Sequence, residues 1–219
     1  MRGAMRAAWA LCLTGCALVS RSAPVELRYF SPESVAAAGG RAEPSCGARL
    51  RLGRVTPSDD LRSRIAHRES PVEIGFYDTL RWTEQPDDYV RRALVRALFA
   101  GRGLVQSTSR RDPTLDVEVT GFEQAGTGGR PAGRVQLTYQ LHDGEVVTRG
   151  EIARQRAARG PDIAQVVAAI GGAMTDATSE LAENVTAALC TGPRSPPSPG
   201  LIGKILATVL DGDRSLHFR

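Results

Sequence analysis

The sequence lacks any apolar run long enough to cross a membrane. A transmembrane helix needs about 20 consecutive apolar residues, whereas the apolar runs here are confined to residues 7–13 and 201–210. Neither run reaches that length. The sequence therefore excludes an integral membrane protein built from helices and predicts a globular domain. Any attachment to a membrane must come from another feature, such as a lipid anchor.

Histidine is scarce, and residues of catalytic or metal-binding type are not grouped. The three histidines, His67, His142 and His217, have no pair at the spacing of metal ligands, and no G-x-S-x-G motif marks a hydrolase nucleophile. The glycine-rich stretch 125–133 (AGTGGRPAG) lacks the following helix and the Lys-Ser/Thr pair of a nucleotide site. The sequence therefore predicts no catalytic residues, no metal site and no cofactor, and it does not indicate an enzyme.

Lysine is also nearly missing, because Lys204 is the single lysine among 28 basic residues. The formal net charge of +4 includes two arginines that belong to a predicted leader. What is left is a weakly basic chain without a clustered basic stripe. Nucleic acid is therefore not an expected partner.

The first residues resemble a bacterial lipoprotein leader. Arg2 and Arg6 precede the apolar run 7–13, and Leu13-Thr14-Gly15-Cys16 looks like a lipobox. Cleavage before Cys16 would leave its sulfur, the one side-chain nucleophile able to form a stable thioether, to carry a diacylglycerol. An ordinary signal peptide with an incidental cysteine is the alternative.

Lipidation at Cys16 would decide where the protein works. A single acyl chain anchors a protein only marginally, so several chains, palmitate among them, would hold it durably on a bilayer. Ala17 stands where an aspartate would signal retention in the inner membrane. We therefore expect a domain in the bacterial envelope that faces the periplasm, anchored to the outer rather than the inner membrane.

Two cysteines, Cys46 and Cys190, remain once the leader is cleaved and Cys16 is lipidated. They can form a disulfide in an oxidising compartment, or they can stay as two unpaired thiols. A bond closing so long a loop would stabilise the fold by about 4–5 kcal/mol in the chain-entropy model.

Alternation of apolar and polar residues predicts most of the β-strands. Asp143-Gly144 predicts a tight hairpin that pairs the last two strands antiparallel. Residues 59–67 fit either a short helix or an extended loop. The predicted strands are residues 25–30, 49–55, 71–77, 104–107, 114–122, 134–142 and 146–154.

Two segments have helical periodicity. Pro86 suits the first position of a helix, and apolar residues at three- and four-residue spacing continue until Gly101. A second apolar stripe follows Pro161 for almost thirty residues, and its Gly171-Gly172 pair indicates a bend or a close approach to the sheet.

The order of these elements predicts the fold class. We expect an α+β (open α/β, two-layer) domain at residues 16–190, with a mixed sheet of about six to seven strands and two long helices on one face. Residues 191–200 are rich in proline and serine and predict a linker. Residues 201–219 form a tail that is either disordered or a small docking segment.

Residues 68–99, RESPVEIGFYDTLRWTEQPDDYVRRALVRALF, carry a resemblance to a known family. Together with the lipobox and an early tyrosine-containing strand, they are similar to the ABC-type transport auxiliary lipoproteins (PqiC-like). The resemblance extends over about residues 16–190, and the matching positions are Tyr29, Arg68, Tyr77, Arg81, Trp82, Glu84 and Pro86.

The resemblance implies a non-enzymatic adaptor of an ABC-linked, MCE-type system that transports phospholipid or another hydrophobic substrate. Its partners would be an MCE-domain protein with the associated permease and ATPase, and it leaves room for a homo-oligomer. A TolB-like or secretion-assembly envelope lipoprotein with a different partner is the alternative.

We choose candidate partner-binding residues by residue type, because Trp and Arg are among the side chains most enriched in the hot spots of protein–protein interfaces. Arg81 and Trp82 are expected in an exposed turn at a strand end, close to Tyr77, and Arg91 and Arg92 on the solvated face of the helix. The alternatives are a core position for Trp82 and an ordinary solvated face for the arginines.

Overall fold

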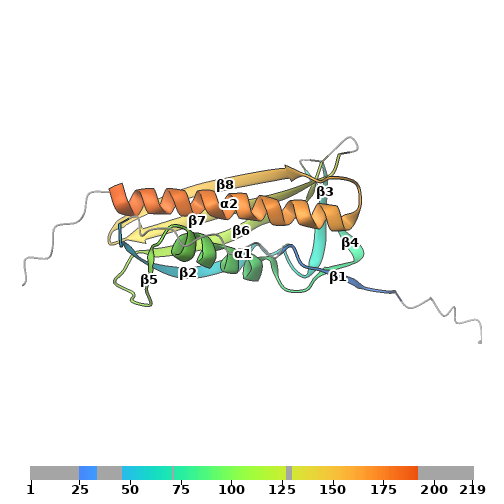
Figure 1. Cartoon of the computed structure of the whole chain (residues 1–219). Coiled ribbons are helices and arrows are strands. Elements are labelled where there is room, and N and C mark those ends of the chain that lie inside the picture. Colours follow the sequence, from blue (N-terminus) through green and yellow to red (C-terminus); the bar gives the residue numbers. More distant parts are fainter. Residues whose placement is uncertain (1–24, 34–45, 71, 127–129, 192–219) are drawn as a thin grey trace, which may run out of the picture.

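The computed structural model describes residues 25–33, 46–70, 72–126 and 130–191. In this part of the chain eight strands form one mixed sheet, and both helices pack on the same face of it (Figure 1). The predicted α+β two-layer fold is confirmed. The predicted lipidation site Cys16, the linker beyond Thr191 and the tail at 201–219 lie outside the described residues.

Three long antiparallel strands form one half of the sheet: β6 (Thr114–Ala125), β7 (Ala132–Asp143) and β8 (Val146–Ala157). The β7–β8 hairpin turns at Gly144, whose φ of 59° lies in the left-handed region that glycine tolerates. This confirms the hairpin predicted from Asp143-Gly144. Every second residue of β7 points into the core, as strand periodicity requires.

The other side of β6 is shared by two groups of strands. β2 (Arg49–Pro57) runs parallel to the first half of β6 and also pairs with the short β5 (Val105–Gln106). β3 (Arg64–Ser70) runs parallel to the last residues of β6, and β4 (Glu73–Trp82) and β1 (Arg28–Phe30) extend the sheet beyond it. As a result, β1 and β5 lie at opposite ends of the domain (Figure 1).

The structure corrects the sequence reading of residues 59–82. In the undecided segment 59–67, residues 59–63 form a loop, as one of the two alternatives has it, and residues 64–67 begin β3; the strand expected at 71–77 is the longer β4. β4 contains a large irregularity, since Arg64 lies opposite Arg81 whereas Ala66 lies opposite Phe76. Extra residues on one strand break the alternation of side chains, which is why the pattern was not evident in the sequence.

The first helix, α1 (Pro86–Val95), begins at the predicted proline. It continues as one π-helical segment, η1 (Arg96–Gly101), and ends at Gly101. Its buried face, which includes Tyr89, Val90 and Leu94, packs on the sheet, and Arg91 and Arg92 are half-buried beside that face.

The long helix α2 (Ile163–Thr191) crosses β7 and β8 and lies beside α1 (Figure 1). Glycines permit a close approach: a Cβ on Gly133 of β7 would collide with the helix backbone at Ile170, and a Cβ on Gly171 would collide with the carbonyl of Pro32. Of the two roles expected for the Gly171-Gly172 pair, the structure therefore favours close packing.

A disulfide connects the segment before β2 to the end of α2. Cys46, just before β2, bonds to Cys190 near the end of α2, with their Cα atoms 5.9 Å apart. The bond closes a loop of 144 residues and attaches the end of α2 to the sheet.

Candidate functional site

The position of Trp82 differs from the exposed turn expected from the sequence. Its side chain is 2% exposed, and its ring centroid lies 5.3 Å from that of Phe122 and 6.3 Å from that of Tyr89. The edge-on geometry of both pairs is favourable for aromatic rings. Trp82 therefore joins α1 to the sheet in the core, which agrees with the core alternative stated for this residue and not with the exposed turn.

Arg81 and Tyr77 stabilise the irregular part of β4. The Arg81 guanidinium donates hydrogen bonds to the carbonyls of Tyr77 (3.1 Å) and Leu80 (2.9 Å). Burial raises the pKa of Tyr77, so its hydroxyl stays protonated and donates to Gln124 Oε1 at 2.8 Å. Both side chains are half-buried; Arg81 holds residues of β4 together, and Tyr77 links β4 to β6.

The arginines of α1 are also engaged within the fold. Arg91 donates to the carbonyl of Gly53 at 3.0 Å. Arg92 bonds to Glu33 (3.0 Å) and Glu84 (2.6 Å), and these hydrogen bonds raise the pKa of Arg92. The same hydrogen bond from Arg92 lowers the pKa of Glu33. Their predicted role in partner binding stays a prediction, to be tested against these internal contacts.

Sequence reasoning missed a buried carboxylate at the junction of β3, β6 and β7. The side chain of Glu123 is 1% exposed and accepts hydrogen bonds from Arg68 (2.7 and 3.1 Å) and Arg134 (2.9 Å). Arg68 is one of the family-like positions, and its bond to Glu123 raises the pKa of Arg68. The alternation along β6 could have placed Glu123 on one face, but no pattern showed that two arginines cover it.

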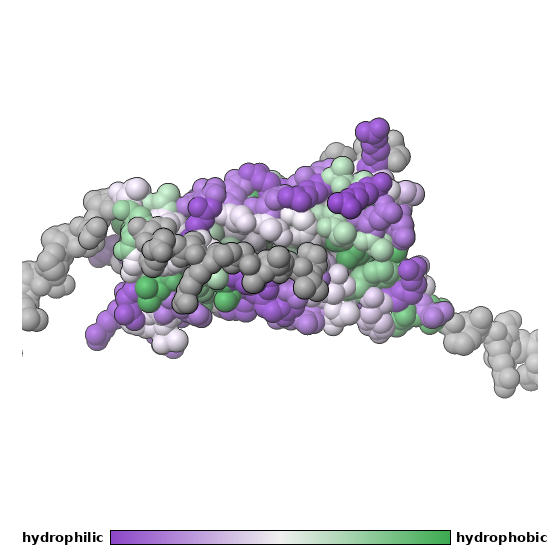
Figure 2. Space-filling model, in the orientation of Figure 1, coloured by the Kyte–Doolittle hydropathy of each residue, from purple (hydrophilic) through white to green (hydrophobic). Residues whose placement is uncertain are grey.

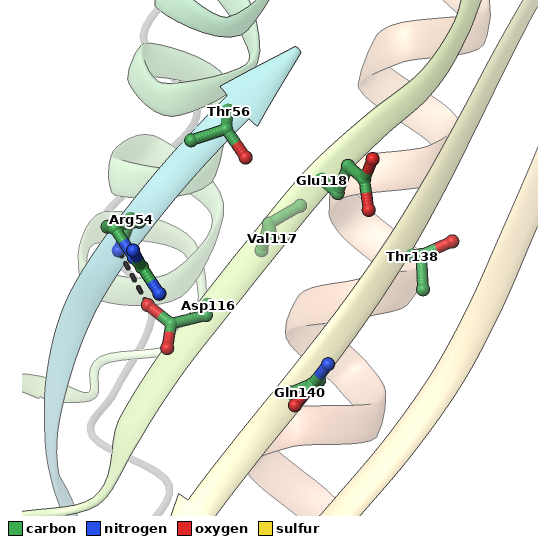
Figure 3. A pocket seen from close by; sticks show the side chains of 7 residues that line it. All are labelled: Arg54, Thr56, Asp116, Val117, Glu118, Thr138 and Gln140. Carbon is green, nitrogen blue, oxygen red and sulfur yellow. Dashed lines mark hydrogen bonds between the residues drawn. The ribbon is translucent and has the colours of Figure 1, made fainter. Parts of the chain in front are cut away.

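The face of the sheet opposite the helices is polar. Figure 3 shows side chains from β2, β6 and β7 on this side, with α1 and α2 behind the strands. They line a shallow depression of about 370 Å³. We call this surface the polar face, and its residues are Arg54, Thr56, Asp116, Glu118, Thr138 and Gln140.

Asp116 shapes the polar face. Its Oδ1 accepts the backbone N–H of Arg54 at 2.7 Å, in the part of β2 where the pairing with β6 shifts register (Figure 3). Gly53 leaves space for this carboxylate, because a Cβ there would collide with Oδ1. The Asp116 carboxylate thus accepts a hydrogen bond from an N–H that the pairing of β2 with β6 leaves without a partner in the sheet. The depression beside it is lined by positively and negatively charged side chains.

Two of the histidines, His67 and His142, lie in the part of the chain that the structure describes. Among the described residues, no group of three or more His, Cys, Asp and Glu side chains is placed to hold a metal ion. His67 packs against the Tyr77 ring with centroids 4.9 Å apart, and His142 Nε2 lies 3.9 Å from Asp116 Oδ2. Neither histidine is placed beside a serine or cysteine nucleophile by these contacts.

Among the described residues, three exposed apolar side chains lie in or just before β1, and Val72, Val105, Val146 and Val147 are exposed elsewhere. Val25, Leu27 and Tyr29 are 67%, 42% and 61% exposed, and Figure 2 shows hydrophobic surface at the end of the domain where β1 lies. Within the described ranges, no helix is both long enough and apolar enough to cross a membrane.

Comparison with solved structures supports the fold. Protein XCC0632 from Xanthomonas campestris is 24% identical, with a TM-score of 0.61 over 75% of this chain and 96% of its own. A second crystal structure, of an uncharacterized protein, is 17% identical, with a TM-score of 0.58 over 73% of this chain and 99% of its own. At these identities the likeness establishes the fold alone. No curated protein sequence matches the chain.

The sequence also matches a family directly, over residues 30–182. This range begins at the last residue of β1 and ends within α2, so it includes β2 to β8, α1 and the larger part of α2. The family consists of lipoproteins by its description, which implies association with the cell envelope. The chain therefore belongs to the family of ABC-type transport auxiliary lipoprotein components.

Proposed function

We propose that this protein is the non-enzymatic lipoprotein component of an ABC-linked, MCE-type lipid transport system. The observation that carries the proposal is the family match over residues 30–182, which spans the described fold from β1 to α2. In this role the domain contacts an MCE-domain protein and couples it, with its permease and ATPase, to a membrane.

Cys16 supplies the anchor in this proposal. The described domain begins at Val25, so a lipidated Cys16 would hold it close to the bilayer, facing the periplasm from the outer membrane. Mass spectrometry of the mature N-terminus tests this part. A diacylglyceryl and acyl modification on Cys16 is expected, whereas an unmodified N-terminus would refute the anchor.

We propose the polar face as the surface that contacts the MCE-domain protein. The helices do not cover it, and Arg54, Asp116 and Glu118 give it charges of both signs around a depression. Complementary charges across an interface determine the register and the association rate more than they determine affinity. Hydrogen-bonding side chains such as Thr138 and Gln140 add directional contacts.

Co-purification with an MCE-domain protein from the same organism tests the proposal. Glu118→Arg, in the middle of the polar face, is expected to weaken association, since like charges brought together in an interface cost several kcal/mol. Glu73→Arg makes the same charge change at an exposed position at the start of β4 and serves as the matched control.

Three outcomes are informative. Association of the unaltered protein that Glu118→Arg weakens and Glu73→Arg preserves supports both the partner and the surface. Association unaffected by either change would refute the polar face as the contact surface. Failure of the unaltered protein to associate with the assembled MCE-domain partner would refute the proposed function.

A further inference from the structure

The N-terminal strand carries an apolar surface that no other described element covers. Tyr29 lies in β1, Val25 and Leu27 occupy alternate positions of the segment that leads into it, and the three are 61%, 67% and 42% exposed. In an extended chain such residues share one side. We call them the β1 stripe.

The position of β1 in the sheet leaves the stripe accessible. Among the described strands, β1 is an edge strand that pairs only with β4, where Tyr29 lies opposite Arg81. Phe30 lies opposite the buried Trp82 and packs against the core, so the neighbouring Tyr29 projects from the other side of the strand. The core therefore fixes the direction in which the stripe points.

The stripe is also the part of the described domain nearest in sequence to Cys16. The nine-residue step from Cys16 to Val25 spans at most about 30 Å even when fully extended. A lipid on Cys16 would therefore hold the stripe within about one bilayer thickness of the membrane surface. At such a distance even weak affinity is sufficient, because tethering converts binding into an intramolecular event at high effective concentration.

We propose that the β1 stripe rests on the bilayer that holds Cys16, with its side chains at the level of the lipid headgroups. The inference rests on the lipid anchor of the proposed function. Tyr29 suits this position, since tyrosine places an apolar ring and a polar hydroxyl on either side of a membrane–water boundary. Val25 and Leu27 add apolar area beside it, and the contact orients the domain relative to the membrane.

A fluorescent probe at Leu27 tests the contact in the full lipidated protein. Leu27→Cys is labelled with the environment-sensitive dye NBD and reconstituted in vesicles of phosphatidylethanolamine and phosphatidylglycerol. Cys46 and Cys190 are bonded to each other and Cys16 carries lipid, so the new thiol is the one labelled. Val105→Cys is the matched control, because Val105 is 44% exposed but lies on β5 at the opposite end of the domain.

The expected result is a blue shift of the probe at position 27 and its quenching by nitroxide-labelled lipids, with neither change at position 105. Replacing Val25 and Tyr29 by serine should abolish the shift, while the protein still floats with the vesicles. An unshifted probe at position 27 in protein that floats would overturn the inference and leave the anchor intact.

Two other outcomes would also overturn it. A shift that requires addition of the MCE-domain protein would assign the stripe to a protein interface. Protein that does not float with the vesicles would refute the lipid anchor, and with it both the proposed attachment and this inference.

Discussion

Removal of the Glu123 carboxylate tests whether the buried ion pair holds β3 against β6. Glu123 is 1% exposed, and three charge-assisted hydrogen bonds reach it, two from Arg68 and one from Arg134. Loss of one partner of a buried ion pair costs roughly 3–5 kcal/mol, because the remaining charge is left without compensation. Both arginines keep 27% of their side-chain surface exposed, and water can partly solvate them.

We therefore expect Glu123→Ala to lower the free energy of unfolding by about 3 kcal/mol, at the lower end of that range. For a domain of this size the melting temperature should fall by roughly 6–12 °C. Urea denaturation followed by the fluorescence of Trp82, which is 2% exposed, measures the change. Arg149→Ala, at an exposed position on β8, is the control and should change stability by less than about 0.5 kcal/mol.

A double-mutant cycle distinguishes the ion pair from a general packing effect. Arg68→Ala combined with Glu123→Ala should cost less than the sum of the single changes, with a coupling energy of about 1.5–3 kcal/mol. A loss below about 1 kcal/mol for Glu123→Ala, or single changes that simply add, would show that the carboxylate does not stabilise this junction.

Three further predictions concern the core, the disulfide and the start of α1. Trp82→Ala should lower the free energy of unfolding by about 3–5 kcal/mol, measured from unfolding curves followed by circular dichroism. Trp82→Phe should still associate with the partner. A loss of association in a stable Trp82→Phe protein would contradict the core position of Trp82. Reduction of the Cys46–Cys190 disulfide should cost about 5 kcal/mol in the chain-entropy model, measured by urea denaturation with and without dithiothreitol, and an unchanged midpoint would count against the bond. Burial raises the pKa of Asp87, so its contribution to stability is full below the usual pKa near 3.8 and is lost as the pH rises through the higher folded-state pKa. Asp87→Asn should therefore stabilise the protein more at pH 7 than at pH 3, and an equal effect at both pH values would refute this reasoning.

Local sequence signals predicted several elements because their causes are local. Pro86 begins α1 since a proline lacks only an N–H that the first helical turn does not use. Gly144 closes the β7–β8 hairpin, since the turn needs a positive φ. Alternation identified β7 because one of its faces is buried and the other is polar.

Other features were not predictable because they depend on contacts between distant residues. The irregularity in β4 disrupts the alternation of Tyr77 and Arg81, and Trp82 is buried because Phe122, forty residues later in the chain, packs against it. Trp82 and the arginines of α1 have the composition of an interface, yet composition does not specify whether a side chain faces solvent or a neighbouring element.

The sequence by itself determined the order of most strands and helices and the family, since each of these depends on residue types at short spacing, and the leader with its lipobox stays a prediction of the same kind. The tertiary structure alone decided the parallel pairing of β2 and β3 with β6, the burial of Trp82 and Glu123, and the separation of the polar face from the helical face. The physical reason is that burial and strand pairing depend on which distant segments pack together, and this information is not contained in any local pattern.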